Sequence, residues 1–366
     1  MFIRSVLLFL LKIIGLYNLY AKFRFNSRLN AINGKIVRKY SSKRQQEGNI
    51  KEDWNSLLIV VPNNFCDKWR AGSGNFYYEI FQSAREKHPE KDIFVHFVKK
   101  DDRDWIETSI KVISDLEPDA ILICPEIDPD GSGDWTVSTF VINLQKMWSG
   151  KFVFLMFDSV YPLHMWRVER LAMLVLNCKI VAIDQRLERK FRKRWNVLGP
   201  VFLPISKESI NFLREKVDEK ILAENLNPIR VSFVGKVYPY REKYLSAIAK
   251  KIQGFEVNPQ NRFKDPEGYL SYITAIKLSK FSINLSRAGG SRVKQLKCRV
   301  LESLLFDSIL VSDDKKNSGF LGIDTQRFVY VRNFKRFQLK KLVNSNFSAL
   351  DSRQLTSEIN SFFDID

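Results

Sequence analysis

The sequence predicts an α/β protein with two doubly wound, Rossmann-like domains. Three observations support this prediction. From Trp54 onward, short apolar runs alternate with mixed stretches of helical character. The runs are almost continuously apolar, as expected of parallel strands that are covered on both faces. The chain has 366 residues, which is more than one hydrophobic core usually serves.

The first half contains six apolar runs that predict strands, at 57–61, 93–98, 120–124, 152–157, 180–183 and 201–203. Helices are expected between them, for example at 76–87, 104–116 and 186–194. Strands that alternate with helices in this way indicate a doubly wound sheet.

The turn-rich stretch ENLNP at 224–228 separates this half from a second series. The second series predicts strands at 230–235, 255–257, 281–286, 308–314 and 328–331. Its helices are expected at 241–252, at 268–278 and around Glu302. The expected domains are therefore 47–225 and 226–333, followed by a helical segment at 334–366. Ligands bind at the carboxyl ends of parallel strands, so we expect a cleft between the domains.

Residues 1–46 form a separate segment. Its apolar start, MFIRSVLLFLLKIIGLYNLYAKF, is interrupted by Arg4 and Lys12, whereas a bilayer span needs roughly 20 mostly apolar residues. We expect an amphipathic helix in the membrane interface. The segment has ten Lys or Arg and no Asp or Glu, which predicts an anionic membrane surface as partner and a cytoplasmic location. The alternative is a core helix followed by a basic linker.

The net charge of +18 favours anionic partners, which include nucleic acid, membrane surfaces and phosphorylated small molecules. The basic excess concentrates near the N-terminus and no nucleic-acid motif is present, so nucleic acid is not the expected partner. The four cysteines, Cys66, Cys124, Cys178 and Cys298, lie far apart and include no CxxC. This spacing predicts a reducing compartment and no structural zinc.

A βα turn in VSFVGKVYPYREKYL is the first candidate for binding chemistry. Gly235 ends a predicted strand, Lys236 follows it, and Arg241 opens the next helix. A glycine lets the backbone approach a ligand closely, and two cations at a helix N-terminus would face a diphosphate. The alternative is an ordinary turn with solvated charges.

The second candidate lies in NLSRAGGSRVKQLKCRVLES. Arg287 leaves a strand, and the loop Gly289, Gly290 and Ser291 could hold phosphate through backbone N–H groups. On the helix that follows, Arg299 and Glu302 share a stripe outside the predicted apolar face. Glu302 could therefore accept two hydroxyl hydrogen bonds from a ribose. The alternative is an ion pair between Arg299 and Glu302.

Taken together, FVGKVYPYR and KCRVLESLLFDSILVSDD resemble the C-terminal domain of GT-B glycosyltransferases, in particular the CgeB-like spore-maturation family. The resemblance covers roughly residues 228–332. It implies that Lys236 and Arg241 contact the donor diphosphate, that Glu302 binds the donor ribose, and that the 289–291 loop lies near the phosphates. Arg287 and Arg299 are included among the donor-binding residues.

Two positions depart from the family pattern. Many retaining GT-B enzymes have a glutamate eight residues before the ribose glutamate, where this chain has Lys294. The small residue that usually follows the helix is Asp307 here. The resemblance therefore leaves both retention and inversion of the anomeric configuration open.

The first half offers candidates for the acceptor side. The loop with Gly72, Gly74 and Asn75 follows the first predicted strand. Asp158 and His164 follow the fourth and are the candidates for the base that deprotonates an acceptor hydroxyl. For Asp158 the alternative is a helix N-cap or a turn residue.

The expected function is a glycosyltransferase that moves a hexose from a nucleotide-diphosphate sugar to a hydroxyl of a glycan, lipid-linked or surface-polysaccharide acceptor. The nucleotide sugar is a substrate, and the resemblance implies neither a cofactor nor a bound metal. The expected location is cytoplasmic, peripheral to the inner face of the cell membrane. The alternative is a non-catalytic protein that binds nucleotide sugars or polyanions on the same scaffold.

Overall fold

The computed structural model describes residues 54–98, 104–124, 135–156, 168, 171–175, 177–182, 196–198, 201–258, 265–286, 298–314, 328–332 and 334. The predicted N-terminal helix lies outside these residues, as does nearly all of the predicted C-terminal helical segment. Within the described residues, no helix has both the length and the apolar character that a membrane crossing requires.

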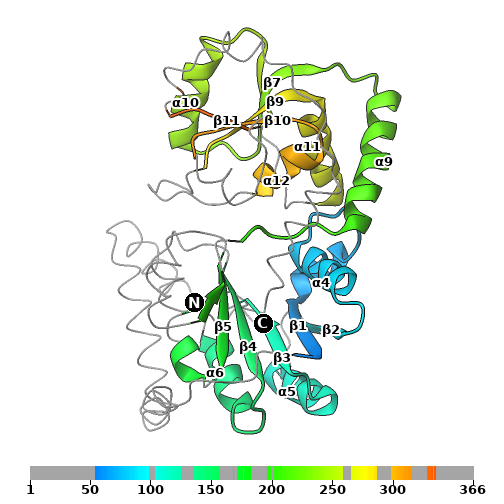
Figure 1. Ribbon diagram of the computed structural model, residues 1–366, viewed down its shortest axis with the longest axis vertical. Helices are drawn as coiled ribbons and strands as arrows, with labels where there is room; N and C mark the ends of the chain where they lie inside the picture. The colour runs from blue at the N-terminus through cyan, green and yellow to red at the C-terminus, as the bar shows by residue number, and fades with distance from the viewer. Residues whose placement is uncertain are drawn as a thin grey trace, which may run out of the picture. The chain divides into compact units, whose positions relative to one another are not determined.

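Two sheets form the framework of the chain (Figure 1). The strands of the first are β1 (Ser56–Pro62), β2 (Asp92–Val98), β3 (Ala120–Ile123), β4 (Lys151–Met156), β5 (Cys178–Ala182) and β6 (Asn196–Leu198). Their order is β2-β1-β3-β4-β5-β6, and each neighbouring pair is parallel. Among the described residues of this part are the helices α5 (Trp105–Leu116) and α6 (Trp135–Leu144).

The second sheet contains β7 (Ile229–Val234), β8 (Phe255–Asn258), β9 (Ser279–Asn284), β10 (Ile309–Ser312) and β11 (Phe328–Tyr330). Its order is β11-β10-β9-β7-β8, again with parallel pairs only. The prediction of an α/β protein with two parallel sheets is therefore confirmed.

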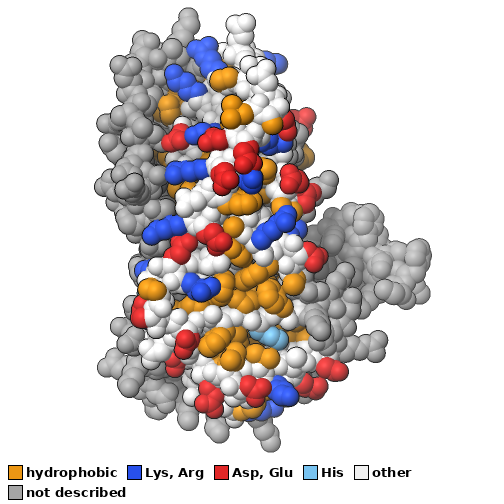
Figure 2. Space-filling view, turned by 90° about the vertical axis from the view of Figure 1, so that its right-hand side faces the viewer, with side chains coloured by type: hydrophobic (Ala, Val, Ile, Leu, Met, Phe, Trp, Pro, Cys, Tyr) orange, Lys and Arg blue, Asp and Glu red, His pale blue; other side chains and the backbone are white. Residues whose placement is uncertain are grey.

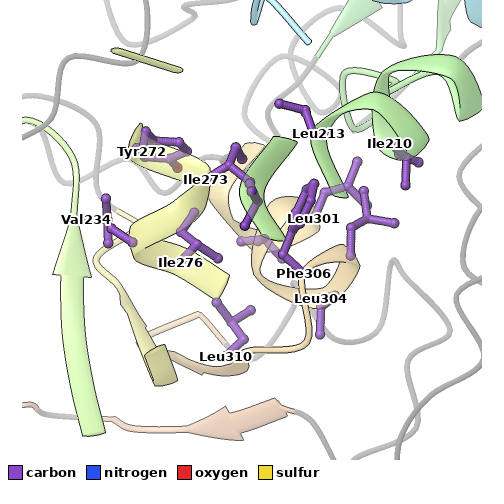
Figure 3. Close-up of a cluster of buried hydrophobic side chains, with 14 of the residues drawn as sticks. Ile210, Leu213, Val234, Tyr272, Ile273, Ile276, Leu301, Leu304, Phe306 and Leu310 are labelled. Atoms are coloured by element: carbon purple, nitrogen blue, oxygen red, sulfur yellow. The ribbon is translucent and has the colours of Figure 1, made fainter. Parts of the chain in front are cut away.

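Helices cover the second sheet on both faces. The first core cluster, which includes Val234 and Leu310, packs against α9 (Lys207–Ala223), α11 (Pro266–Leu278) and α12 (Cys298–Leu305). Figure 3 shows side chains of these helices meeting in this cluster. The second cluster holds Phe233 and Val311 together with α10 (Pro239–Ala249). Neighbouring strand residues thus enter opposite clusters, as the alternation of side chains along a strand requires.

One predicted strand is wrong. Residues 201–203 have no strand partner, and the last strand of the first sheet is β6 instead. The run is apolar because it is buried: Phe202 packs into the cluster formed with α9 and α11. Burial alone produces the same apolar pattern as a short buried strand. Helices α6 and α9 were not predicted.

The chain divides into two compact units. One contains the described residues up to Cys66 and those between Glu90 and Gly199. The other contains Asp67–Pro89 and the described residues from Pro200 onward. Helix α4 (Phe76–Lys87) therefore groups with the second sheet, whereas the sequence analysis assigned it to the first domain.

Hydrogen bonds explain this grouping of α4. The buried Glu79 carboxylate accepts the Ser206 N–H at 2.8 Å, the Ser206 hydroxyl at 2.9 Å and the Ser209 hydroxyl at 2.6 Å. Ser206 is the N-cap of α9. Beside it, Tyr78 donates its hydroxyl to Glu208 at 2.9 Å. Burial and the neighbouring Glu208 raise the pKa of Tyr78 to about 12, so this hydroxyl stays protonated. Glu79 thus fastens α4 to the start of α9.

The exposed side of α9 has mixed charge. Lys216 pairs with Glu219 at 2.7 Å and Lys220 with Glu224 at 2.5 Å. In the upper part of Figure 2, basic and acidic side chains are likewise interspersed. Exposed pairs of this kind contribute little to stability. This side of α9 therefore does not present a uniformly basic surface.

Replacing Glu79 by Ala should destabilise the fold by about 2–4 kcal/mol, because three donors that include a buried N–H would lose their acceptor. Urea unfolding of the full chain measures this. Glu215→Ala, an exposed change on α9, is the control and should cost less than about 0.5 kcal/mol. Equal midpoints for the two variants would contradict the role assigned to Glu79.

Candidate functional site

The carboxyl end of β7 is the topological switch point of the second sheet. The chain leaves β7 for β8 on one side and then reaches β9 on the other side of β7. Open parallel sheets bind ligands at the carboxyl ends of strands at such a point. The first sheet has an equivalent switch between β1 and β3, but the motif residues of the sequence analysis gather at β7.

Gly235 follows β7 with a φ of +128°, a conformation that side chains disfavour. Its N–H donates to the Asn258 carbonyl at 2.8 Å, which fixes the turn to the end of β8. A Cβ at this position would overlap Nη2 of Arg299, the head of the side chain that α12 supplies. The glycine therefore leaves the space that the Arg299 guanidinium occupies.

The Arg299 guanidinium is buried and incompletely bonded. Its side chain is 8% exposed, and its Cζ lies 4.6 Å from the centre of the Phe233 ring. Within the described part of the chain, its Nε and Nη1 have no hydrogen-bond partner. Unbonded buried donors are costly, and more so when they are charged. An anion bound at these two N–H groups would remove that cost.

Arg241 also lies near the Phe233 ring. It is 5% exposed, and its Cζ lies 5.6 Å from the Phe233 ring centre and 5.0 Å from that of Tyr238. Its Nη1 donates to the Lys236 carbonyl at 2.7 Å. Arg241 therefore orders the turn before α10 and also adds a second buried positive charge beside Phe233.

Lys236 is exposed, with its Nζ 5.4 Å from the centre of the Tyr238 ring. Three cations predicted from two separate motifs, Lys236, Arg241 and Arg299, thus lie around one turn and its aromatic side chains. Helix α10 begins in the same turn, with Pro239 in its first turn and Tyr238 as N-cap. Its N-terminal dipole also favours an anion there.

The prediction that Glu302 lies outside the buried face of α12 is wrong. Glu302 is fully buried, and the other residues from Arg299 to Leu305 are buried as well. Its Oε1 accepts the Tyr269 hydroxyl at 3.0 Å and its Oε2 accepts the Tyr272 hydroxyl at 2.8 Å. Helix α12 is short and is packed on several sides, so a single apolar stripe does not describe its environment. Nε and Nη1 of Arg299 make no bond to Glu302.

Asn284 was not predicted. It ends β9, beside β7, and is fully buried. Its Nδ2 donates to the Ser312 hydroxyl at 3.2 Å, while its Oδ1 has no partner within the described residues. The asparagine in the predicted strand FSINLS was the available signal. Tyr269 and Tyr272 were also missed, because aromatic residues three apart on a helix are usually core residues.

The loop with Gly72, Gly74 and Asn75 packs within the second unit. Gly72 donates its N–H to the Ser209 hydroxyl at 3.0 Å. An added Cβ at Gly74 would meet the Tyr269 ring at 2.8 Å. Asn75 is the N-cap of α4 and accepts the Tyr77 N–H at 3.0 Å. The structure thus shows what this loop contacts, and its predicted acceptor role stays a prediction.

Six other predicted site residues lie outside the described part of the chain. They are the candidate bases Asp158 and His164 and the donor-loop residues Arg287, Gly289, Gly290 and Ser291. The geometry of the candidate site is therefore that of Lys236, Arg241, Arg299, Glu302 and their neighbours.

The chain has a weak structural similarity to a known glycosyltransferase structure. A crystal structure of an alpha1,3-fucosyltransferase aligns with 11% sequence identity and a TM-score of 0.36, over 89% of this chain and 85% of that chain. A similarity of this size assigns no activity. No family model and no curated protein sequence matches the chain.

Gly235→Ala should displace Arg299 and lower the affinity for pyrophosphate about tenfold or more, because charge-assisted hydrogen bonds contribute roughly 1.5–3 kcal/mol. Isothermal titration calorimetry with pyrophosphate measures this. Gly254→Ala is the control, since Gly254 also has a positive φ, +74°, but no atom within 4 Å of an added Cβ. Unchanged pyrophosphate affinity in Gly235→Ala would contradict the assignment.

Proposed function

We propose that this protein is a glycosyltransferase of the GT-B type that uses a nucleotide-diphosphate sugar as donor. The observation that carries the proposal is the buried Arg299 guanidinium at Gly235, with Nε and Nη1 unbonded within the described residues. A diphosphate would supply the missing acceptors, and Arg241 would help to neutralise the negative charge of the diphosphate.

The sequence motifs support the same proposal independently. FVGKVYPYR supplies Gly235, Lys236 and Arg241, and KCRVLES supplies Arg299 and Glu302. These motifs resemble the glycosyltransferase pattern in their order and spacing. Their arginines now lie beside the same ring, that of Phe233. A shared ligand explains why cations from two separate segments converge there.

The proposed chemistry is the departure of a nucleoside diphosphate from the sugar. Negative charge grows on the diphosphate as the glycosidic bond breaks, and fixed guanidinium groups stabilise it. A base must take the proton of the acceptor hydroxyl in a direct displacement, and Asp158 and His164 remain the predicted candidates. The proposed acceptor is a glycan, lipid-linked or surface-polysaccharide hydroxyl. We also propose that the protein acts at the inner face of the cell membrane, because its N-terminal segment is basic.

Glu302 stays a predicted donor contact. A carboxylate offers about four acceptor positions, and the two tyrosine hydroxyls occupy one on each oxygen. Contact with the donor ribose would have to use the remaining positions of a side chain that is fully buried in this structure. Its bonds favour a supporting role, which is developed below.

Arg299→Ala should weaken binding of the donor nucleotide roughly 30-fold or more, since truncating one partner of a buried charge pair costs about 2–5 kcal/mol. Thermal shift and calorimetry with UDP, GDP, CDP and ADP, alone and as sugar conjugates, measure this. Arg230→Ala is the matched control, because it removes the same charge from an exposed residue at the opposite end of β7. Equal effects of the two variants would overturn the proposed donor site.

Asp158→Asn and His164→Ala separate turnover from binding. If one of these residues is the base, its variant should lose nucleotide release by about 10²-fold or more while keeping donor affinity. Release of the nucleotide from the preferred donor, with and without glycan acceptors, is the assay. Donor binding without release in the unmodified protein would instead support the non-catalytic alternative, which Lys294 also favours.

A further inference from the structure

Arg299 and Glu302 lie one turn apart on α12, a helix of eight residues. The position of Arg299 therefore depends on what holds this short helix. Isolated helices of this length are not stable in water, so packing and hydrogen bonds must fix it. The contacts of Glu302 are one polar part of that support, and another is the bond from Arg214 Nη2 of α9 to the Leu305 carbonyl at 3.1 Å.

Glu302 joins α12 to α11 through two hydrogen bonds. Tyr269 and Tyr272 donate to different oxygens of the carboxylate, at 3.0 and 2.8 Å. Their rings are stacked, with centres 6.0 Å apart and an angle of 15° between planes. Because each hydroxyl binds a different oxygen, the pair restricts rotation of the carboxylate as well as its position.

The Tyr269 ring is packed in turn against the backbone of Gly74. A Cβ there would meet three ring carbons at 2.8 to 3.1 Å, so any larger residue would push the ring. Gly74 has a φ of +72°, which also suits glycine. The ring thus lies where it does only because position 74 has no side chain.

The loop that carries Gly74 is itself fixed. The Gly72 N–H bonds the Ser209 hydroxyl at 3.0 Å, and this hydroxyl donates to Glu79 at 2.6 Å. All of these residues belong to the second unit. A continuous set of contacts therefore runs from the start of α9 through the loop and Tyr269 to Glu302.

We propose that Glu302 is a positioning residue: with Tyr269 and Tyr272 it fixes α12 and so holds the Arg299 guanidinium at Gly235, and the Gly72–Gly74 loop is part of this support. The proposal rests on the proposed function, because it takes the anion at Arg299 to be a nucleoside diphosphate. It gives the loop a role in donor binding instead of acceptor binding.

A double-mutant cycle tests whether Glu302 acts through Arg299. Affinity for the preferred nucleoside diphosphate is measured for Glu302→Ala, Arg299→Ala and the double variant, with circular dichroism to confirm folding. If Glu302 only positions Arg299, the affinity of the double variant for the nucleoside diphosphate is at most about twofold lower than that of Arg299→Ala alone. Full additivity of the two losses would overturn the proposal.

Milder variants keep the test valid if Glu302→Ala does not fold. Tyr269→Phe and Tyr272→Phe remove one hydroxyl each and keep the rings. Each should weaken binding of the nucleoside diphosphate about 3- to 10-fold. In the Arg299→Ala background, neither should weaken this binding further. Unchanged affinity in both variants would overturn the proposal.

A comparison of sugars distinguishes positioning from ribose contact. The affinity ratio of the ribonucleoside diphosphate to its 2′-deoxy form is measured in the unmodified protein and in the Tyr269→Phe, Tyr272→Phe and Glu302→Ala variants. Positioning predicts a ratio that stays constant within about twofold, because both ligands lose the same diphosphate contact. A ratio that falls to one in Glu302→Ala would show direct ribose contact and overturn the proposal.

Gly74→Ala tests the contribution of the loop, with Gly254→Ala as matched control. The two glycines have nearly equal φ values, +72° and +74°, but only Gly74 has neighbours where the Cβ would go. Gly74→Ala should therefore lower both the melting temperature and the diphosphate affinity more than Gly254→Ala does. In a Tyr269→Ala background, Gly74→Ala should lower the melting temperature no more than Gly254→Ala does. Equal effects of the two substitutions on both measurements would overturn the role of the loop.

The failure of the proposed function would look different. If the unmodified protein binds none of the four nucleoside diphosphates, the donor site and the positioning role both fall. If it binds one and the cycle is additive, only the positioning role falls.

Discussion

The Arg299 guanidinium is buried beside Gly235 and Phe233, and the candidate site is arranged around this one charged group. A charge removed from water must be compensated by partners, and Nε and Nη1 have none within the described residues. The glycine gives the guanidinium its space, the Phe233 ring gives it a favourable face, and Arg241 adds like charge nearby. Such an arrangement is stable enough to persist, yet it favours any anion that can complete it.

The support of this group comes from distant parts of the sequence. Helix α12 is tied to α11 by Glu302, α11 packs on the loop before α4, and α4 is fastened to α9 by Glu79. The glycines at positions 74 and 235 have the same role, because each leaves room for a side chain from a helix: Tyr269 of α11 at Gly74 and Arg299 of α12 at Gly235. The polar bonds of this unit thus position a binding residue as well as stabilising the fold.

Much of the framework could be predicted from the sequence. The apolar runs of β1, β3, β4 and β10 are buried strands because few other structures bury so many consecutive apolar residues. Residues 201–203 show the limit of that reasoning, since an irregular buried segment has the same pattern. Gly235, Arg241 and Arg299 could be found from motif order. The burial of Glu302 and its bonds to Tyr269 and Tyr272 could not, because they depend on how α11 and α12 pack, which helical periodicity within one element does not reveal.

The NMR signal of the Arg299 Nε–H group, followed during titration with nucleoside diphosphates, shows directly whether this guanidinium binds the ligand. Arg299→Lys identifies the signal by its absence. If the diphosphate becomes the missing acceptor, the signal should shift and its exchange with water should slow as the ligand binds. A ligand that binds the protein while leaving this signal unchanged would show that Arg299 does not hold the diphosphate.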